Sequence, residues 1–230
     1  MTNFKVVICL LILVFTVNMS FAQDWANLNR YREDNARIGA PKSGEKRVVF
    51  MGNSITDAWI NFCPEYFSNN GYIDRGISGQ TTPQMLVRFR ADVINLKPAV
   101  VTILAGTNDI AGNTGPSTLE MIADNIYSMA ELAKSNGIKV ILSSVLPVYD
   151  YPWKPGLQPA EKIVKLNEMI KSYADSHGII YLDYYSSVVD ERKGMKAEYS
   201  KDGVHPNRAG YEVMMKLCTE AIQKALASKK

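Results

Sequence analysis

The 230-residue chain contains 47% hydrophobic and 21% charged residues, the composition of an ordinary globular protein and not of a disordered or fibrous one. Its 26 basic and 23 acidic residues give a formal net charge of +3 without a long basic tract, so neither nucleic acid nor an anionic membrane is an expected partner. This length suits one domain, and we expect a single domain over residues 23–230.

The first 22 residues differ from the rest and predict a signal peptide. Lys5 is their only charge, residues 6–17 form an apolar core, and small residues precede a cleavage site between Ala22 and Gln23. An uncleaved membrane anchor is the alternative, but the apolar run is shorter than the roughly 20 residues that a span needs. We therefore expect export to the periplasm or the extracellular space, with no stable membrane insertion after cleavage.

Apolar runs and helical periodicity alternate along the remaining chain. Strands are predicted over residues 47–51, 72–75, 99–105, 139–145 and 179–183, and helices over 24–38, 58–67, 83–96, 117–135, 161–176 and 208–226. Such alternation is typical of an α/β fold with a parallel sheet. In these sheets, binding sites form outside the carboxyl ends of the strands.

The first strand breaks at Gly52 and is followed by Ser54. A serine between a strand and a helix N-terminus lies beside free backbone N–H groups, which suits a nucleophile whose substrate becomes an oxyanion. The segment from Ser54 to Asp57 is also an S-x-x-D pattern, close to a helix capping box. Locally, both interpretations remain open.

Two histidines could act as the base that a serine nucleophile needs. His177 lies at a predicted helix C-terminus, where a structural role is favoured. His205 follows Asp202 by three residues, and a turn between them could bring the carboxylate to Nδ1, leaving Nε2 free to face Ser54. An ordinary surface histidine beside a turn is the alternative for His205.

Gly79 and Asn108 follow the second and third predicted strands, as Ser54 follows the first. One crevice could therefore hold all three. The backbone N–H groups of Ser54 and Gly79 and the side-chain amide of Asn108 are candidate oxyanion donors. Taken singly, Gly79 and Asn108 are equally typical of turns.

Four segments resemble, in order and spacing, the conserved blocks of the SGNH (GDSL-like) hydrolases: Gly52-Asn53-Ser54-Ile55-Thr56, Ile77-Ser78-Gly79-Gln80-Thr81, Gly106-Thr107-Asn108-Asp109 and Asp202-Gly203-Val204-His205-Pro206-Asn207. The overall pattern also looks like the platelet-activating-factor acetylhydrolase-like branch. The resemblance implies a flavodoxin-like three-layer α/β/α sandwich with a five-stranded parallel sheet. It further implies nucleophile Ser54, base His205, orienting acid Asp202, the three oxyanion donors above, and no metal or cofactor.

The first block departs from the family pattern at two positions, with Asn53 in place of Asp and Ile55 in place of Leu. Because the acid of the triad corresponds to Asp202, activity is still expected. An amide at position 53 can bind the backbone of the turn as a carboxylate would.

The substrate class is less constrained than the reaction, because the family covers acetyl esters of sugars, thioesters, lysophospholipids and acetylated phospholipids. Export and a loop with Tyr149, Tyr151 and Trp153, which could stack on sugar rings, favour a carbohydrate O-acetylesterase. Asn53 and Gln80 are further candidate substrate contacts. The alternatives are a short-acyl phospholipid or lysophospholipid esterase and, in other classes, a non-catalytic carbohydrate-binding module or a flavin-binding flavodoxin.

Cys63 and Cys218 remain after the predicted cleavage and could pair in an oxidising compartment, although free buried thiols are favoured. Two cysteines and two histidines do not make a convincing zinc site, so no metal is expected. The sequence specifies neither the oligomeric state nor the acyl chain length.

Overall fold

The computed structural model describes residues 24–228, so the predicted signal peptide lies outside the described residues. The centre is a five-stranded, all-parallel sheet with strand order β2-β1-β3-β4-β5. The strands are β1 (Val48–Gly52), β2 (Ile73–Gly76), β3 (Val100–Leu104), β4 (Lys139–Ser143) and β5 (Ile180–Leu182). All five predicted strands are present, and their order confirms the expected fold.

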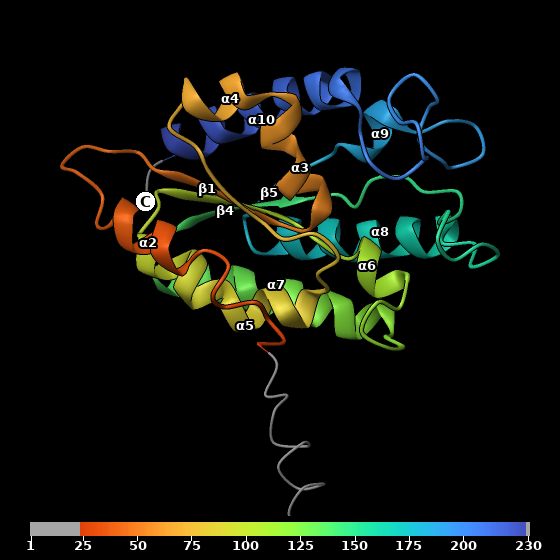
Figure 1. Ribbon diagram of the computed structural model, residues 1–230, viewed down its shortest axis with the longest axis horizontal. Helices are drawn as coiled ribbons and strands as arrows, with labels where there is room; N and C mark the ends of the chain where they lie inside the picture. The colour runs from red at the N-terminus through yellow and green to blue at the C-terminus, as the bar shows by residue number, and fades with distance from the viewer. Residues whose placement is uncertain (1–23, 229–230) are drawn as a thin grey trace, which may run out of the picture.

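Helices cover both faces of this sheet (Figure 1). Helices α3, α4 and α10 lie on one face, whereas α5, α7 and α8 lie on the other. The helices are α2 (Arg32–Ile38), α3 (Ser54–Phe62), α4 (Pro64–Ser68), α5 (Thr82–Asp92), the 3₁₀ turn η1 (Ile94–Leu96), α6 (Thr107–Ile110), α7 (Leu119–Ser135), α8 (Ala160–Ser176), α9 (Tyr185–Val188) and α10 (Arg208–Ala227).

The helix predicted over residues 24–38 forms only in its second half. In the first half, the Asp24 carboxylate accepts hydrogen bonds from the backbone N–H groups of Leu28 and Asn29, each at 2.8 Å. An aspartate side chain that binds the following backbone in this way favours a turn over a continuous helix. Residues 24–31 therefore cross the surface as a series of turns.

Two other helices differ from their predicted limits. The helix predicted over residues 58–67 begins earlier, at Ser54, and is interrupted before Pro64, which has no N–H to continue the hydrogen-bond ladder. The helix predicted over residues 83–96 ends at Asp92, and a separate 3₁₀ turn follows it. The earlier start of α3 matters most, because it makes Ser54 the first residue of the helix.

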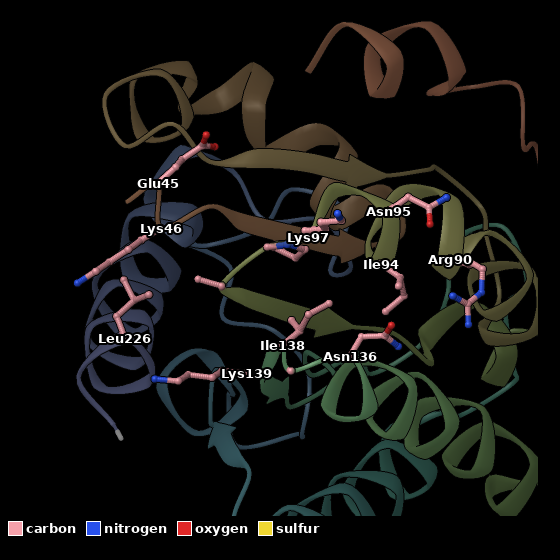
Figure 2. A pocket seen from close by; sticks show the side chains of 13 residues that line it. Glu45, Lys46, Arg90, Ile94, Asn95, Lys97, Asn136, Ile138, Lys139 and Leu226 are labelled. Atoms are coloured by element: carbon pink, nitrogen blue, oxygen red, sulfur yellow. The ribbon is translucent and has the colours of Figure 1, made fainter. Parts of the chain in front are cut away.

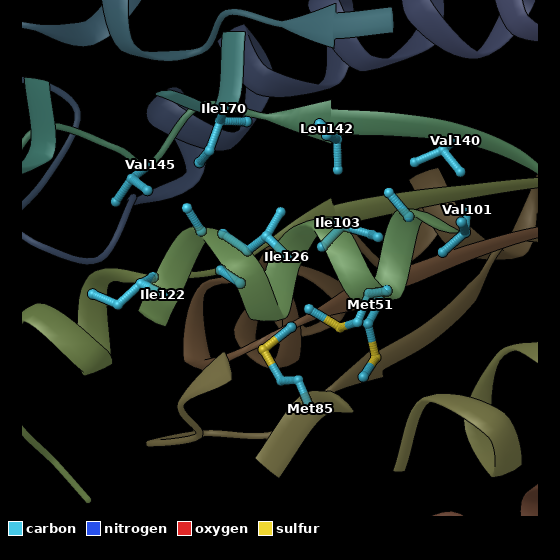
Figure 3. Close-up of a cluster of buried hydrophobic side chains, with 14 of the residues drawn as sticks. Met51, Met85, Val101, Ile103, Ile122, Ile126, Val140, Leu142, Val145 and Ile170 are labelled. Atoms are coloured by element: carbon cyan, nitrogen blue, oxygen red, sulfur yellow. The ribbon is translucent and has the colours of Figure 1, made fainter. Parts of the chain in front are cut away.

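Alternate residues of the central strands enter two separate cores. The core under α5, α7 and α8, part of which is drawn in Figure 3, includes Val49, Met51, Val101, Ile103 and Leu142. The core under α3, α4 and α10 includes Val48, Phe50, Val100, Leu104 and Ile141. Because both faces of the central strands β1 and β3 are buried, these strands are almost wholly apolar in sequence.

Cys63 and Cys218 are both buried with free thiols. Burial raises the pKa of the Cys218 thiol to about 11 and also raises the pKa of Cys63. The favoured interpretation, free buried cysteines, is confirmed, and the two side chains serve as small core residues on the α10 face.

Candidate active site

Ser54 begins α3 directly beyond the carboxyl end of β1. The helix cap is its neighbour Asn53, whose Oδ1 accepts a hydrogen bond from the Ile55 N–H at 3.0 Å. The Ser54 hydroxyl is thus left to lie 2.9 Å from His205 Nε2. The capping interpretation of Ser54 is wrong, and the Asn53 amide binds the turn as expected.

The turn before Ser54 requires glycine at position 52 because α3 folds back closely onto the strand. A Cβ atom on Gly52 would lie 1.9 Å from Thr56 Oγ1, far inside van der Waals contact. This close approach places the helix N-terminus, with its free N–H groups, at the edge of the sheet.

His205 is held by Asp202 in the geometry that the sequence suggested. Asp202 Oδ2 lies 2.7 Å from His205 Nδ1, while Oδ1 accepts the backbone N–H groups of His205 at 2.8 Å and Val204 at 2.9 Å. Partial burial opposes the charged carboxylate, but these hydrogen bonds outweigh it and lower the pKa of Asp202 to about 2. A carboxylate at Nδ1 favours the imidazole tautomer whose Nε2 can accept a proton from Ser54.

Ser54 and His205 are 151 residues apart in sequence, and helix α10 brings them together. The buried Tyr211 of α10 donates its hydroxyl to the Ile55 carbonyl of α3 at 2.8 Å. Ahead of α10, the buried Ser200 donates to the His205 carbonyl at 2.8 Å and accepts the Gly203 N–H at 3.0 Å, which closes the histidine turn. No sequence pattern singled out Ser200 or Tyr211.

The three candidate oxyanion donors, in Ser54, Gly79 and Asn108, follow the carboxyl ends of the neighbouring strands β1, β2 and β3. Among residues 24–228, the backbone N–H groups of Ser54 and Gly79 have no hydrogen-bond acceptor. Gly79 adopts φ +79°, in the left-handed region that favours glycine. Asn108 donates one hydrogen of its amide to the Gln80 carbonyl at 2.9 Å, which leaves the second hydrogen for a ligand.

Asp109 connects the Asn108 turn to the Gly79 loop. Its buried carboxylate accepts the Thr82 N–H at 2.9 Å and the Thr82 hydroxyl at 2.6 Å, where α5 begins. Burial raises the pKa of Asp109 to about 6, even though these hydrogen bonds act in the opposite direction. Asp109 was not among the predicted site residues, although it belongs to the third conserved block.

An Asp109→Asn variant should therefore change the pH dependence of stability. A carboxyl whose folded-state pKa is raised contributes stability below its unfolded pKa, and this contribution is lost as the pH rises toward about 6. Relative to wild type, the free energy of unfolding of Asp109→Asn should rise by up to about 3 kcal/mol between pH 4 and pH 8. Urea unfolding at both pH values measures this, with the surface variant Asp124→Asn as control. If the difference in free energy of unfolding between Asp109→Asn and wild type were the same at both pH values, the expectation would be contradicted.

The predicted substrate contacts divide into buried and exposed groups. Asn53, Gln80 and Tyr151 are buried, and their side chains are already hydrogen-bonded within the protein. The Tyr151 hydroxyl, for example, donates to the Thr107 carbonyl at 2.8 Å. These three side chains therefore offer substrate no open face. By contrast, Trp153 is 47% exposed with its ring centroid 6.1 Å from that of His205, and Tyr149 is also exposed.

A cavity of about 790 Å³ lies at the amino ends of the strands, on the side away from Ser54. Its basic residues are Lys46, Arg90, Lys97 and Lys139, and Figure 2 shows that these side chains do not converge on one point. Helices α5, α7 and α10 end at this cavity, and basic side chains are favoured at helix C-termini. Lys139, for example, donates to the Ala225 carbonyl of α10 at 2.8 Å. The fold thus accounts for Lys139 and for Arg90, which lies in the last turn of α5.

Residues 24–228 contain no group of three or more side chains suited to hold a metal ion. None of the helices in this part of the chain is long and apolar enough to cross a membrane.

Comparison with known proteins shows the family of this chain. The model of the GDSL-like lipase/acylhydrolase family matches residues 50–213, from the strand before Ser54 to the helix after His205. The chain belongs to this family. It is accordingly a serine ester hydrolase of the GDSL type, and its parallel sheet is that of the family fold.

Individual proteins to which this chain is similar include bacterial proteins named as esterases or acylhydrolases. The crystal structure of a candidate acylhydrolase from Bacteroides fragilis NCTC 9343 is 53% identical, with a TM-score of 0.87 over 89% of this chain and 99% of that one. A multidomain esterase from Ruminococcus flavefaciens is 33% identical over 129 residues, 55% of this chain and 16% of the relative. An acetylxylan esterase from Xylanibacter ruminicola is 27% identical over 224 residues, 81% of this chain. The match spans 45% of that esterase, so the chain covers only part of both curated relatives.

Proposed function

We propose that this esterase removes acetyl and other short acyl groups from carbohydrates through a Ser54-His205-Asp202 triad. The observation that carries the proposal is the continuous chain of contacts from Ser54 Oγ to His205 Nε2 at 2.9 Å and from His205 Nδ1 to Asp202 at 2.7 Å. A non-catalytic binding module has no need of this arrangement.

In the proposed reaction, Ser54 Oγ attacks the ester carbonyl carbon while His205 Nε2 takes the hydroxyl proton. The carbonyl oxygen becomes an oxyanion, which the N–H groups of Ser54 and Gly79 and the free Asn108 amide hydrogen stabilise. His205 then returns the proton to the leaving alcohol, and an acyl group remains on Ser54. Water then attacks that acyl-enzyme while His205 takes its proton, and the carboxylic acid is released as the Ser54 Oγ–acyl bond breaks and His205 returns the proton to Ser54 Oγ.

The exposed ring of Trp153 supports a sugar as the alcohol part of the substrate. The loop that carries it is closed by Asp150, whose carboxylate accepts the N–H groups of Gly156 at 2.6 Å and Leu157 at 3.2 Å. Trp153 also packs on buried Tyr151, with ring centroids 5.1 Å apart. A fixed, half-exposed indole beside the base offers an apolar face of the kind on which a sugar ring can stack. The acetylxylan esterase relative is named for such a substrate.

Trp153→Ala is expected to raise KM for an acetylated xylooligosaccharide about fivefold, since a lost aromatic contact of this kind removes on the order of 1 kcal/mol. The kcat/KM for p-nitrophenyl acetate should change by less than about twofold, because that small ester does not need the stacking face. Steady-state kinetics on both substrates measures the two effects. Trp25→Ala, which removes a half-exposed indole from the N-terminal turns, is the control.

The substrate class is tested by measuring acetate release from acetylated xylan, acetylated sialic acids and short-acyl phospholipids side by side. The proposal predicts the highest kcat/KM on a carbohydrate ester. A preference for the phospholipid would instead favour the acetylhydrolase-like alternative. Export, with cleavage after Ala22, remains part of the proposal.

A further inference from the structure

A buried arginine outside the triad contacts both the nucleophile turn and the oxyanion loop. Arg88 of α5 is fully buried. Its guanidinium donates to the Gly52 carbonyl at 3.0 Å, to Gln80 Oε1 at 2.5 Å and to the Asp92 carboxylate at 3.0 Å. Gly52 lies two residues before Ser54, whereas Gln80 directly follows Gly79.

Gln80 is held on both sides of its amide. Its Oε1 accepts from Arg88, and its Nε2 donates to the Ala26 carbonyl of the N-terminal turns at 2.8 Å. The Gln80 backbone carbonyl in turn accepts the Asn108 amide at 2.9 Å. A single path of hydrogen bonds therefore runs from Gly52 through Arg88 and Gln80 to Asn108.

We propose that Arg88 is a positioning residue that sets the three oxyanion donors relative to one another. It fixes the Ser54 turn through the Gly52 carbonyl, and the Gly79 loop and Asn108 through Gln80. The inference rests on the catalytic roles proposed above for Ser54, Gly79 and Asn108. Arg88 itself lies outside the contacts that substrate would make.

The choice of acceptors separates this role from simple core packing. Burying a guanidinium is costly, and an apolar side chain of similar size would fill the same space without that cost. Among the described residues, Asp92 supplies the only carboxylate within ion-pair distance of Arg88, so the rest of the planar fork serves two neutral acceptors on two different segments, the end of β1 and the Gly79 loop. Lysine can pair with Asp92 but lacks the planar fork of donors that joins both segments.

The test uses Arg88→Lys, the near-isosteric Gln80→Met and the control Arg90→Lys, an exposed arginine two residues further along α5. Active sites are counted by titration with a fluorophosphonate, which reacts with the nucleophilic serine. For Arg88→Lys and Gln80→Met, kcat per titrated site on p-nitrophenyl acetate should fall at least tenfold, while KM changes less than threefold. Misplaced donors weaken transition-state stabilisation more than substrate binding.

In the double variant, Arg88→Lys with Gln80→Met, kcat per titrated site should be no more than about threefold lower than in the more impaired single variant, because both substitutions break the same path of hydrogen bonds. In the control Arg90→Lys, kcat per titrated site should stay within twofold of wild type. A purely structural role predicts a different pattern, in which the number of titrated sites and the Tm fall but kcat per site is retained. That pattern would overturn the inference.

Ser54→Ala, measured in parallel, separates the inference from the proposed function. If Ser54→Ala retains the wild-type rate, the proposed triad fails. If Ser54→Ala is inactive while Arg88→Lys and Gln80→Met keep kcat per site within twofold of wild type, only the positioning role fails. Should Arg88→Lys not fold, Gln80→Met, which buries no new charge, decides the question alone.

Discussion

Ser54→Ala is expected to lower kcat/KM for p-nitrophenyl acetate by at least roughly a thousandfold, because among the described residues only the Ser54 hydroxyl is hydrogen-bonded to His205 Nε2. The Ser54 hydroxyl is 2.9 Å from His205 Nε2, and the residual rate would come from the oxyanion donors and binding alone. The measurement is steady-state hydrolysis by purified protein, together with a fluorophosphonate labelling assay. Both activity and labelling should be lost.

Stability should not account for that loss. The α3 cap is the Asn53 side chain, so alanine at position 54 leaves the helix start intact. We expect the free energy of unfolding to change by less than about 1 kcal/mol. Ser176→Ala, which removes a serine hydroxyl at the end of α8, is the control and should keep full activity. Undiminished turnover in a folded Ser54→Ala protein would refute the assignment.

Asp202→Asn is expected to lower kcat by about ten thousandfold, through the tautomer of His205. Two backbone N–H groups, those of Val204 and His205, donate to Asp202 Oδ1. In the variant they require the amide oxygen at that position, which turns the NH₂ group toward His205 Nδ1. The imidazole must then accept at Nδ1 and carry its proton on Nε2, where it cannot take the proton of Ser54.

The pH profile provides a second readout for Asp202. Its folded-state pKa of about 2 keeps the carboxylate charged at every pH at which an esterase is usually assayed, so the acid limb of wild-type activity should not report Asp202. A lowered pKa contributes stability above the unfolded value of about 4, and this contribution is lost as the pH falls toward 2. The Tm difference between wild type and Asp202→Asn should narrow over that range. The control is Asp183→Asn, which removes an exposed carboxylate after β5 and should leave kcat within twofold of wild type. If kcat fell as far in Asp183→Asn as in Asp202→Asn, the specific role of Asp202 would be contradicted.

Much of the architecture follows from short-range pattern. Strands buried on both faces are almost wholly apolar, as residues 48–51 and 100–104 are, and their alternation with helical segments leaves a parallel sheet as the expected solution. The order and spacing of the motifs around Ser54, Gly79, Asn108 and His205 identified the family. Helix limits were less certain, because Asp24 and Pro64 act on the local backbone in ways that hydrophobic periodicity does not register.

The sequence by itself determined the reaction class of this protein: a serine after a strand, a histidine with its own carboxylate, and donors at the ends of neighbouring strands. Only the tertiary structure decided that Asn53 caps α3 and leaves the Ser54 hydroxyl to His205, and that Gln80 faces the buried Arg88 instead of substrate. The physical reason is the distance along the chain over which each interaction acts. A capping pattern and a catalytic serine look alike within a few residues, and contacts between groups 151 residues apart exist only once α10 has packed on α3.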